Sequence, residues 1–395
     1  MSSTAEQMTF PRPLGPDGLP DPLLLEVVRE RPVLRVIGPG GGAAWLVAGE
    51  KEVREVLNEP LRFTSRPDPT VDDKRARDGV PMVGMDPPEH TRIRRLASKV
   101  FTARRIQAMV PDIKELVGSL MDDMEAAEQP ADLVSTLALP LPMNVIFRVL
   151  GGIPDEDRDD LRRWSQVFIS LGSSTAEEIE TAMVEFQERL RRLVVDRRQN
   201  LGDDLLSDLI RARDGRDALS EEELIATTGL IIVAGHETTA KTLTRGVMVL
   251  TKSDLWSRIA AGALPVGQVV EETLRHQPPI DTCIWRTAKN DTELAGEHIK
   301  AGEQVLVSLN LANLDPTARQ NPLEFVPTRR DAGHMTFGHG PHFCLGAALA
   351  RAELAVALQG LSERFLRLQV AVPHAELEWT AGSMLNAPVA LPVTW

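Results

Sequence analysis

The spacing of apolar residues along the chain predicts long helices in its middle and short strands on either side. Over the helical stretches, apolar residues recur every three or four positions, so each helix presents one apolar face. The expected helices span 91–101, 112–127, 176–200 and 220–250. Runs rich in β-branched and aromatic residues predict a hairpin at 33–48 and strands at 283–287, 303–309 and 389–395. We therefore expect a mainly α protein with small β-sheets.

No linker divides the chain into separate units. Proline and glycine are frequent over 1–22, which predicts an extended N-terminal arm, and over 311–343, which predicts a long irregular segment. We therefore expect a single domain over 23–395. The glycine-rich stretch 38–42 suggests a phosphate-binding loop, but it lacks the Lys-Ser/Thr pair that such a loop needs, so a hairpin turn is the better interpretation.

The composition argues against several classes of protein. The chain has 57 acidic and 44 basic residues, a net charge of −13, so its overall field repels nucleic acid and anionic membranes. Its two cysteines, Cys283 and Cys344, cannot form a disulfide framework. The first residues lack a signal-peptide pattern, and the longest apolar stretch, 133–147, is interrupted by two prolines. We expect a cytoplasmic monomer without nucleic-acid or membrane partners.

The stretch Phe337–Gly346, with the sequence FGHGPHFCLG, carries the strongest chemical signal. Its three glycines indicate a backbone that bends tightly or passes close to a flat group. Cys344 directly precedes an apolar helical run, and backbone N–H groups at a helix N-terminus favour a thiolate, which suits a proximal haem ligand. Two alternatives stay open: Cys344 is a small buried hydrophobe, or zinc is bound by His334, His339, His342 and Cys344.

This stretch resembles the cysteine loop of cytochrome P450 monooxygenases, F-x-x-G-x-(H/R)-x-C-x-G. The resemblance implies the cytochrome P450 fold, in which haem lies between a long central helix and the cysteine loop. It also implies that Cys344 is the fifth ligand of the iron and that His342 contacts a haem propionate. The remaining haem-binding residues implied for this loop are Phe337, Gly338 and Gly346.

A second stretch, Ala234–Thr239, places a glycine, an acid and two threonines in the middle of the helix expected over 220–250. Such residues are locally unfavourable there, so we expect an interruption of the helix. On its own the stretch is compatible with the polar face of a surface helix. It resembles the family's oxygen-activation motif, which implies that Gly235 leaves room for dioxygen and that Glu237 and Thr238 deliver protons. His236 fills a variable position and receives no role.

A third motif, Glu272–Arg275, places an acid and a base on one helix face. Taken alone it is typical of a solvated surface pair. Because two prolines follow and the cysteine loop lies downstream, it resembles the family's structural pair. Many relatives add a later arginine to this pair; here Glu324 stands in that position, and Arg329 or Arg330 is the expected substitute.

A fourth motif, Asp86–Arg94, predicts a turn and a helix start with His90 and Arg94 on one side. A solvated basic helix is the plain alternative. The stretch resembles the family element whose histidine and arginine bind a haem propionate, and Arg286 matches a further propionate-binding arginine. The four motifs occur in the family's order, and the resemblance is to the soluble bacterial class, in particular to actinobacterial biosynthetic members.

The resemblance implies a haem-thiolate monooxygenase that oxidises a hydrophobic natural-product intermediate. It would use haem b, dioxygen and electrons from NAD(P)H delivered through a reductase and a ferredoxin. Alternatives are oxidative C–C or C–N coupling, for example of cyclic dipeptides, and a non-catalytic haem or zinc protein.

By the same resemblance we expect nine residues to contact the substrate, although each is also compatible with a plain core role. They are Phe63, Met82, Val83, Met85, Ala234, Ile284, Trp285, Met384 and Leu385. We also expect a basic patch that docks the ferredoxin, made of Arg92, Arg95, Lys99, Arg104 and Arg105. The same charges are compatible with a role in solubility alone.

Overall fold

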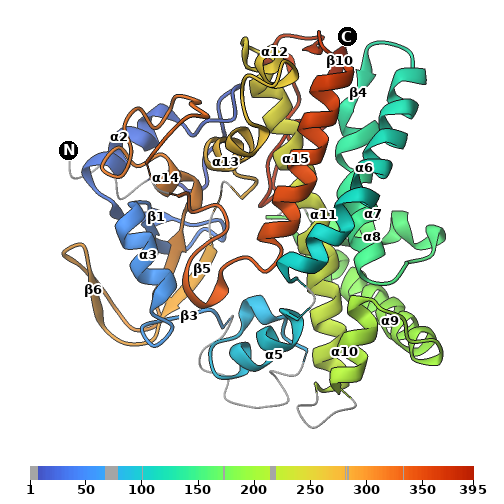
Figure 1. Cartoon of the computed structure of the whole chain (residues 1–395). Helices are drawn as coiled ribbons and strands as arrows, with labels where there is room; N and C mark the ends of the chain where they lie inside the picture. Colours follow the sequence, from blue (N-terminus) through green and yellow to red (C-terminus); the bar gives the residue numbers. More distant parts are fainter. Residues whose placement is uncertain are drawn as a thin grey trace.

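Helices form one side of the molecule and most of the strands form the other (Figure 1). The structure is a computed structural model that describes residues 8–66, 79–99, 101–171, 174–213, 219–280, 282, 284–331 and 333–395. Its helices are α2 (Pro22–Glu30), α3 (Glu50–Asn58), α5 (Glu89–Ala97), α6 (Ala103–Ala126), α7 (Pro140–Val149), α8 (Arg158–Phe168), α9 (Ala176–Gln199), α10 (Leu205–Arg213), α11 (Glu221–Leu250), α12 (Leu255–Ala260), α13 (Val266–His276), α14 (Leu309–Asn313) and α15 (Ala347–Arg364). Short 3-10 turns are η1 (Met82–Gly84), η3 (Asp155–Asp157), η4 (Gly340–His342) and η5 (His374–Glu376), and η2 (Val134–Ala138) is a π turn.

The strands form three small sheets. The largest has the order β1 (Val33–Ile37), β2 (Ala43–Val47), β8 (Gln304–Val307), β5 (Ile284–Ala288) and β3 (Phe63–Thr64). The others are β4 (Ala131–Asp132), β10 (Pro392–Thr394) and β9 (Gln369–Val370), and the pair β6 (Thr292–Leu294) and β7 (Glu297–Ile299). The expected hairpin is confirmed, since β1 and β2 pair antiparallel, and β2 pairs parallel with β8. The mainly α architecture with small sheets is therefore confirmed.

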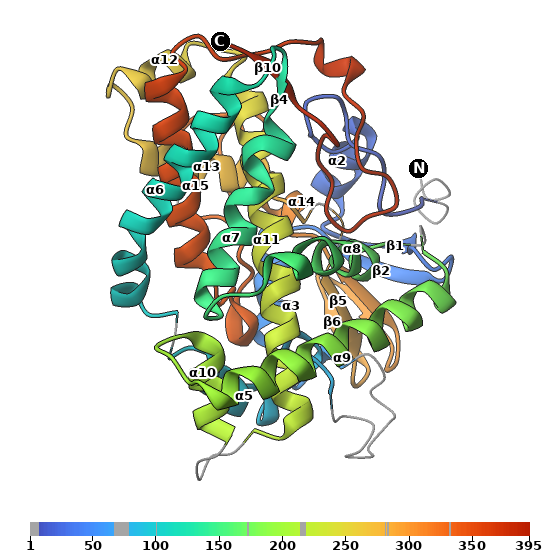
Figure 2. The ribbon, with the colours of Figure 1, turned by 90° about the vertical axis from the view of Figure 1, so that its right-hand side faces the viewer.

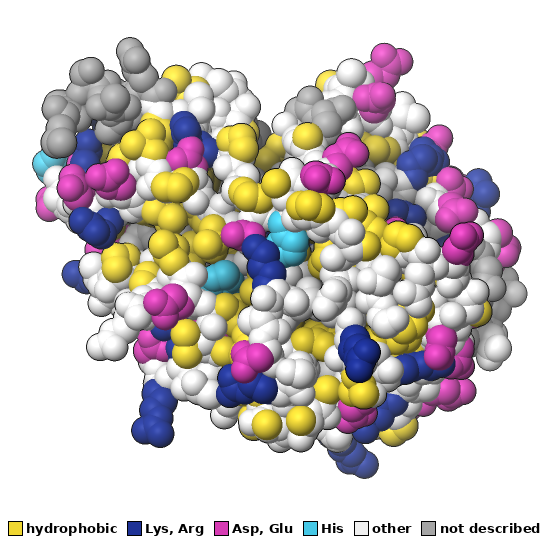
Figure 3. All heavy atoms as spheres, turned by 90° about the horizontal axis from the view of Figure 1, so that it is seen from above, with side chains coloured by type: hydrophobic (Ala, Val, Ile, Leu, Met, Phe, Trp, Pro, Cys, Tyr) yellow, Lys and Arg dark blue, Asp and Glu magenta, His cyan; other side chains and the backbone are white. Residues whose placement is uncertain are grey.

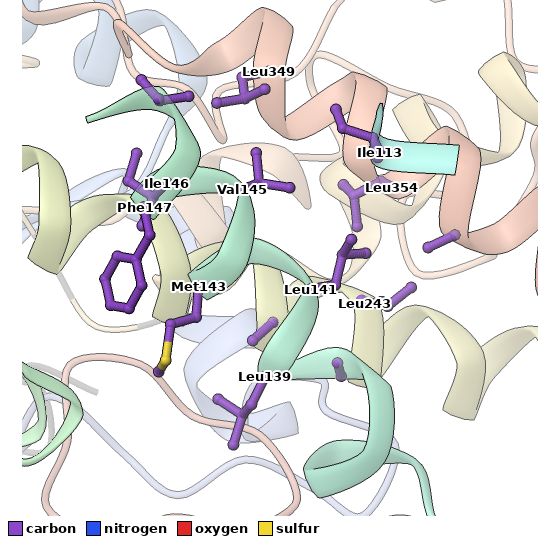
Figure 4. Packing of buried hydrophobic residues seen from close by; sticks show 14 of the residues in the cluster. Ile113, Leu139, Leu141, Met143, Val145, Ile146, Phe147, Leu243, Leu349 and Leu354 are labelled. Atoms are coloured by element: carbon purple, nitrogen blue, oxygen red, sulfur yellow. The ribbon is translucent and has the colours of Figure 1, made fainter. Parts of the chain in front are cut away.

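The helix α11 runs through the middle of the helical side in both views (Figures 1 and 2). It begins with a capping box: the Ser220 hydroxyl accepts a hydrogen bond from the Glu223 amide, and the Glu223 carboxylate accepts one from the Ser220 amide. The helix contacts α7, α9 and α15. Their apolar side chains fill the space between them, as Figure 4 shows for Leu141 and Val145 of α7, Leu243 of α11 and Leu354 of α15.

The start of α6 and the continuity of α11 differ from the sequence prediction. The helix α6 begins at Ala103 rather than Asp112, because the Thr102 hydroxyl caps its first turn and Pro111 lies inside the helix. Its buried face, which includes Ile106 on one side of the proline and Ile113 on the other, packs into the core and keeps the helix continuous. The expected interruption of α11 is wrong as well: the helix runs unbroken from Glu221 to Leu250.

The described part of the N-terminal arm and the glycine-rich turn both lie at the largest sheet. The arm runs beside β1, since the Phe10 amide donates to the Ile37 carbonyl at 2.9 Å, and α2 begins at Pro22 under the Asp21 cap. Across residues 38–42, the Gly38 amide donates to the Gly42 carbonyl in a plain hairpin turn.

Among the described residues, no helix is long and apolar enough to cross a membrane. On the face shown in Figure 3, acidic and basic side chains are interspersed.

Candidate haem site

A mainly apolar cavity of about 290 Å³ lies between α11 and the cysteine loop. The α11 residues on its wall are Leu230, Ile231, Ala234, Gly235, Thr238, Thr239 and Thr242. The opposite wall is built by Phe337–Gly338, by His342–Gly346 and by the first half of α15. The cavity therefore lies between a helix that carries hydroxyl groups and a loop that carries a sulfur.

The glycines of the cysteine loop set its path. Gly338 and Gly340 have φ of +71° and +67°, which L side chains rarely adopt. A Cβ added to Gly340 would lie 2.5 Å from the Leu57 carbonyl oxygen at the end of α3, so the loop passes against backbone there. The Cys344 amide donates to the Phe337 carbonyl at 2.8 Å, which closes the loop and places the cysteine on the cavity wall.

The electrostatics of Cys344 differ from the sequence expectation. Burial raises the pKa of its thiol, although the amides of Gly346 and Ala347 and the guanidinium groups of Arg94 and Arg351 act in the opposite direction. The helix N-terminus alone therefore does not produce a thiolate. A thiolate at this position requires a further cation beside the sulfur, which an iron ion supplies.

Four donor groups from three segments meet at one end of the cavity: His90 and Arg94 of α5, Arg286 of β5 and His342 of the cysteine loop. The rings of His90 and His342 lie 4.0 Å apart between centroids, and the Arg94 guanidinium donates to the Phe343 carbonyl at 2.6 Å. Burial, and then the charge of Arg94, lowers the pKa of His90 to about 4. Burial, followed by the charges of His90 and Arg286, lowers the pKa of His342 to about 3, and burial lowers that of Arg286 to about 10.

Part of this donor cluster has no hydrogen-bond partner within the described residues. Both ring nitrogens of His90 are buried without a hydrogen-bond partner in the structure. The carboxylate of Asp86, whose charge acts on His90 and Arg286, accepts hydrogen bonds from the Thr64 hydroxyl and the Ser65 amide. Buried donors of this kind fit two further carboxylates, which is the number that haem b carries.

The zinc interpretation is wrong for the described part of the chain, which holds no group of three or more His, Cys, Asp or Glu residues placed to bind a metal. His334 turns to Glu271, with 3.3 Å between Nε2 and the carboxylate, and His339 turns to Arg54 at 3.4 Å. The proposed ligands therefore point in different directions.

On α11 the acid and the alcohol of the sequence motif face different surroundings. Thr238 lines the cavity, and its hydroxyl donates to the Ala234 carbonyl at 2.8 Å. Glu237 is buried beside the cavity without lining it, and its Oε2 lies 3.6 Å from Lys241 Nζ. A Cβ added to Gly235 would meet Ile146 of α7 at 2.9 Å, so this glycine also permits close helix packing.

The Glu272–Arg275 pair is buried, which excludes the surface-pair interpretation. Both guanidinium contacts to the carboxylate measure 2.8 Å, and the two side chains are 4% exposed or less. Arg329 is the third member of the network, with its Nε 3.2 Å from Glu272 Oε1. The carbonyl of Glu324 accepts hydrogen bonds from both arginines, so this residue contributes its backbone.

The sequence matches the cytochrome P450 family over residues 32–254 and 265–388. The chain belongs to the cytochrome P450 family. It is 39% identical over 379 residues to mycinamicin IV hydroxylase/epoxidase of Micromonospora griseorubida, with 94% of each chain covered. It is 40% identical over 373 residues to nocardicin C N-oxygenase of Nocardia uniformis subsp. tsuyamanensis, with 93% of each covered. The solved LnmA hydroxylase from the leinamycin pathway of Streptomyces atroolivaceus has a TM-score of 0.86 and 40% identity, covering 98% of this chain and 100% of that one.

Membership in the family establishes the general chemistry. The protein is a cytochrome P450 monooxygenase, an oxidoreductase that uses haem and dioxygen. Proteins of this kind receive electrons from a redox partner and act on small molecules. The apolar cavity, the cysteine on its wall and the donor cluster at its end fit the haem group that the family implies.

The residues expected to contact substrate separate into two groups in this cytochrome P450. Met82, Val83, Ala234 and Ile284 line the cavity. The remaining five lie outside its lining: Phe63, Met85, Trp285, Met384 and Leu385. Trp285 points outward with 37% exposure, because alternate residues of a strand face opposite sides and its neighbour Ile284 faces the cavity. Phe63 packs in the hydrophobic cluster beneath the large sheet.

Sequence reasoning missed several residues of the cavity wall. Phe101, Ile146, Leu230 and Ile280 all line it. Ile280 directly follows Pro278-Pro279, which was an available signal, whereas nothing in the local sequence distinguishes Ile146 from the other apolar residues of α7.

The predicted basic patch is partly neutralised by acidic residues of the same chain. Arg92 pairs with Glu223, and Arg105 pairs with Asp208 at 2.7 Å and with Asp203 at 2.6 Å.

Glu353 of α15 is a further residue that the sequence did not single out. It lines the cavity region, is 2% exposed, and its Oε2 has no hydrogen-bond partner in the structure. Burial raises the pKa of this carboxyl well above its ordinary value. The folded protein therefore binds this proton more tightly than the unfolded chain does, so the contribution to stability is full at acidic pH and is lost as pH rises.

Replacing Glu353 with glutamine is expected to stabilise the protein at alkaline pH by about 1–3 kcal/mol, because the amide keeps the size and removes the titration. Thermal unfolding midpoints of wild type and Glu353→Gln, measured between about pH 5.5 and pH 8, should diverge as pH rises. Glu363→Gln at the exposed end of the same helix is the control and should follow wild type. Parallel curves for Glu353→Gln and wild type would show that this carboxyl does not stay protonated.

Proposed function

We propose that this cytochrome P450 inserts one oxygen atom into a hydrophobic natural-product intermediate. The observation that carries the proposal is the apolar cavity between the Thr238 hydroxyl and Cys344. Apolar side chains such as Met82, Ile231 and Ile284 favour a substrate with extensive hydrocarbon surface. Relatives named for mycinamicin and nocardicin support a role in secondary metabolism.

The site residues divide into those that hold the cofactor and those that handle protons. Cys344 would hold the iron as a thiolate, and His90, Arg94, Arg286 and His342 would hold the two propionates. Haem bound there supplies the activation of dioxygen. Thr238 faces the same cavity and would present a hydroxyl to the oxygen substrate, while Glu237 behind it would replace the proton that this hydroxyl gives up.

Electrons would come from NAD(P)H through a reductase and a small ferredoxin, because the chain carries no cysteine pattern for an iron–sulfur cluster of its own. The donor would dock on the side of the molecule that carries Cys344. Arg95, Lys99 and Arg104 are exposed there and are candidates for its docking by their exposure and charge. Arg92 pairs with Glu223, and Arg105 pairs with Asp203 and Asp208. We propose that the enzyme acts as a monomer in the cytoplasm.

A reconstituted assay tests this function. Ligands are first selected by their shift of the ferric haem from low to high spin, and the enzyme is then supplied with ferredoxin, reductase, NADPH and each selected compound. Wild type is expected to give a product one oxygen heavier than its substrate. Thr238→Ala is expected to consume NADPH while product formation falls about 10²-fold and hydrogen peroxide accumulates, because proton delivery is lost.

Two outcomes would contradict the proposal. A product lighter by two hydrogens, without added oxygen, would show oxidative coupling instead. Unchanged coupling of NADPH to product in Thr238→Ala would remove the role assigned to this hydroxyl. Thr244→Val serves as the control, since Thr244 is a buried threonine of the same helix whose hydroxyl bonds to the Ala240 carbonyl, away from the cavity wall.

A further inference from the structure

His236 is a buried histidine beside the acid of the oxygen-activation motif. It is 1% exposed, and its Nδ1 lies 2.8 Å from the carbonyl oxygen of Ile232 one helical turn earlier. A carbonyl oxygen only accepts hydrogen bonds, so Nδ1 must carry a proton. The helix backbone therefore selects one tautomer of this ring.

The second ring nitrogen is consequently an acceptor. Burial lowers the pKa of His236, and the positive charges of Arg162 on α8 and Lys241 on α11 act in the same direction, while Glu237 and the bond to Ile232 oppose them. The ring is therefore neutral at neutral pH, with a lone pair on Nε2.

This lone pair lies 3.8 Å from Oε1 of Glu237. Both atoms are buried, and neither has a hydrogen-bond partner in the structure. A carboxylate oxygen and an imidazole lone pair are both acceptors, so their approach inside the protein is unfavourable unless a proton lies between them. The other carboxylate oxygen faces Lys241 Nζ at 3.6 Å, which leaves Oε1 for the histidine.

We propose that His236 positions Glu237 and that the two residues together hold one proton beside Thr238. The proton leaves Oε1 of Glu237 and passes through solvent to the Thr238 hydroxyl, because the two side chains face different surroundings, and that hydroxyl gives its own proton to the oxygen substrate in the cavity. Solvent then returns a proton to the His236–Glu237 pair, and no other bond changes. His236 is a positioning residue here, and the inference rests on the proton-delivery role of Glu237 and Thr238 proposed above.

The tautomer is tested directly by nitrogen NMR. In the diamagnetic ferrous carbon monoxide complex labelled with ¹⁵N-histidine, the His236 signals are assigned by their loss in His236→Gln. We expect a neutral ring with its proton on Nδ1, and an Nε2 shift typical of a hydrogen-bond acceptor that changes in Glu237→Gln. A charged ring, or a proton on Nε2, overturns the proposal, and neither result depends on turnover.

Kinetics test the consequence for proton delivery. His236→Phe, which keeps the bulk and removes the acceptor, is expected to lower product formed per NADPH about tenfold and to alter its pH profile, with substrate affinity by spin-state titration unchanged. His236→Gln, which keeps a donor and an acceptor, should restore most of the coupling. Unchanged coupling and pH profile in His236→Phe overturn the proposal. If Thr238→Ala leaves the coupling of NADPH to product unchanged while His236 has the expected tautomer, the proposed function is contradicted and the positioning of Glu237 by His236 is not.

Discussion

Cys344→Ser is expected to abolish the red-shifted Soret band of the reduced carbon monoxide complex and all monooxygenase activity. The reason is chemical: a serine hydroxyl at this position cannot replace the electron donation of a thiolate. Burial already raises the pKa of the cysteine thiol, and a hydroxyl in the same surroundings is far harder to ionise. The spectrum is measured on protein reconstituted with hemin, so that loss of iron ligation is separated from poor haem supply during expression.

The matched control is Cys283→Ser, which removes the other cysteine of the chain. It is expected to retain the thiolate spectrum. If Cys344→Ser keeps the same spectrum, another group holds the iron. The assignment of Phe337–Gly346 as the loop that binds the haem iron would then be wrong. The same measurement distinguishes a haem enzyme from a protein that merely has the fold.

Local motifs predicted several residues that line the cavity, because each motif is short and fixes its own backbone. Gly340 shows why: its positive φ and its approach to the Leu57 carbonyl are requirements that the sequence displays directly as glycine. The meeting of His90, Arg94, Arg286 and His342 is different, since three distant segments are involved: α5, β5 and the cysteine loop. Periodicity cannot place them together, and only the resemblance to a known family did so.

Side-chain direction was less predictable than position. Glu237 and Thr238 are adjacent in sequence, yet one helical step of about 100° turns only the threonine to the cavity. For Trp285 the signal was available: in a two-residue alternation, a strand that directs Ile284 and Arg286 inward must direct the tryptophan outward. The helical continuity of α11 was not predictable from residue propensities, because tertiary packing against α7 and α15 outweighs them.

The second prediction with a large expected effect concerns the buried network around Glu272. This carboxylate is 4% exposed and lies between two guanidinium groups, those of Arg275 and Arg329, and it also accepts a hydrogen bond from the Val326 amide at 2.7 Å. The two arginines in turn bind backbone carbonyls of the irregular segment that precedes the cysteine loop, among them those of Pro322 and Asn321. The carboxylate therefore fixes a long segment that has few helical or strand hydrogen bonds of its own.

Glu272→Gln is expected to lower the free energy of unfolding by about 3–5 kcal/mol and to reduce haem retention, because it leaves the buried Arg275 guanidinium without its anion and removes the nearer of the two carboxylates that face Arg329. The control is the same substitution at the neighbouring position: Glu271→Gln breaks a half-exposed pair with Arg351 and weakens the contact with His334, and it is expected to cost about 1 kcal/mol. Denaturation followed by circular dichroism and by Soret absorbance measures both quantities. Equal losses for the two variants would show that the buried network adds nothing beyond a surface ion pair, and the segment that leads to Cys344 would then be held by backbone contacts and apolar packing alone.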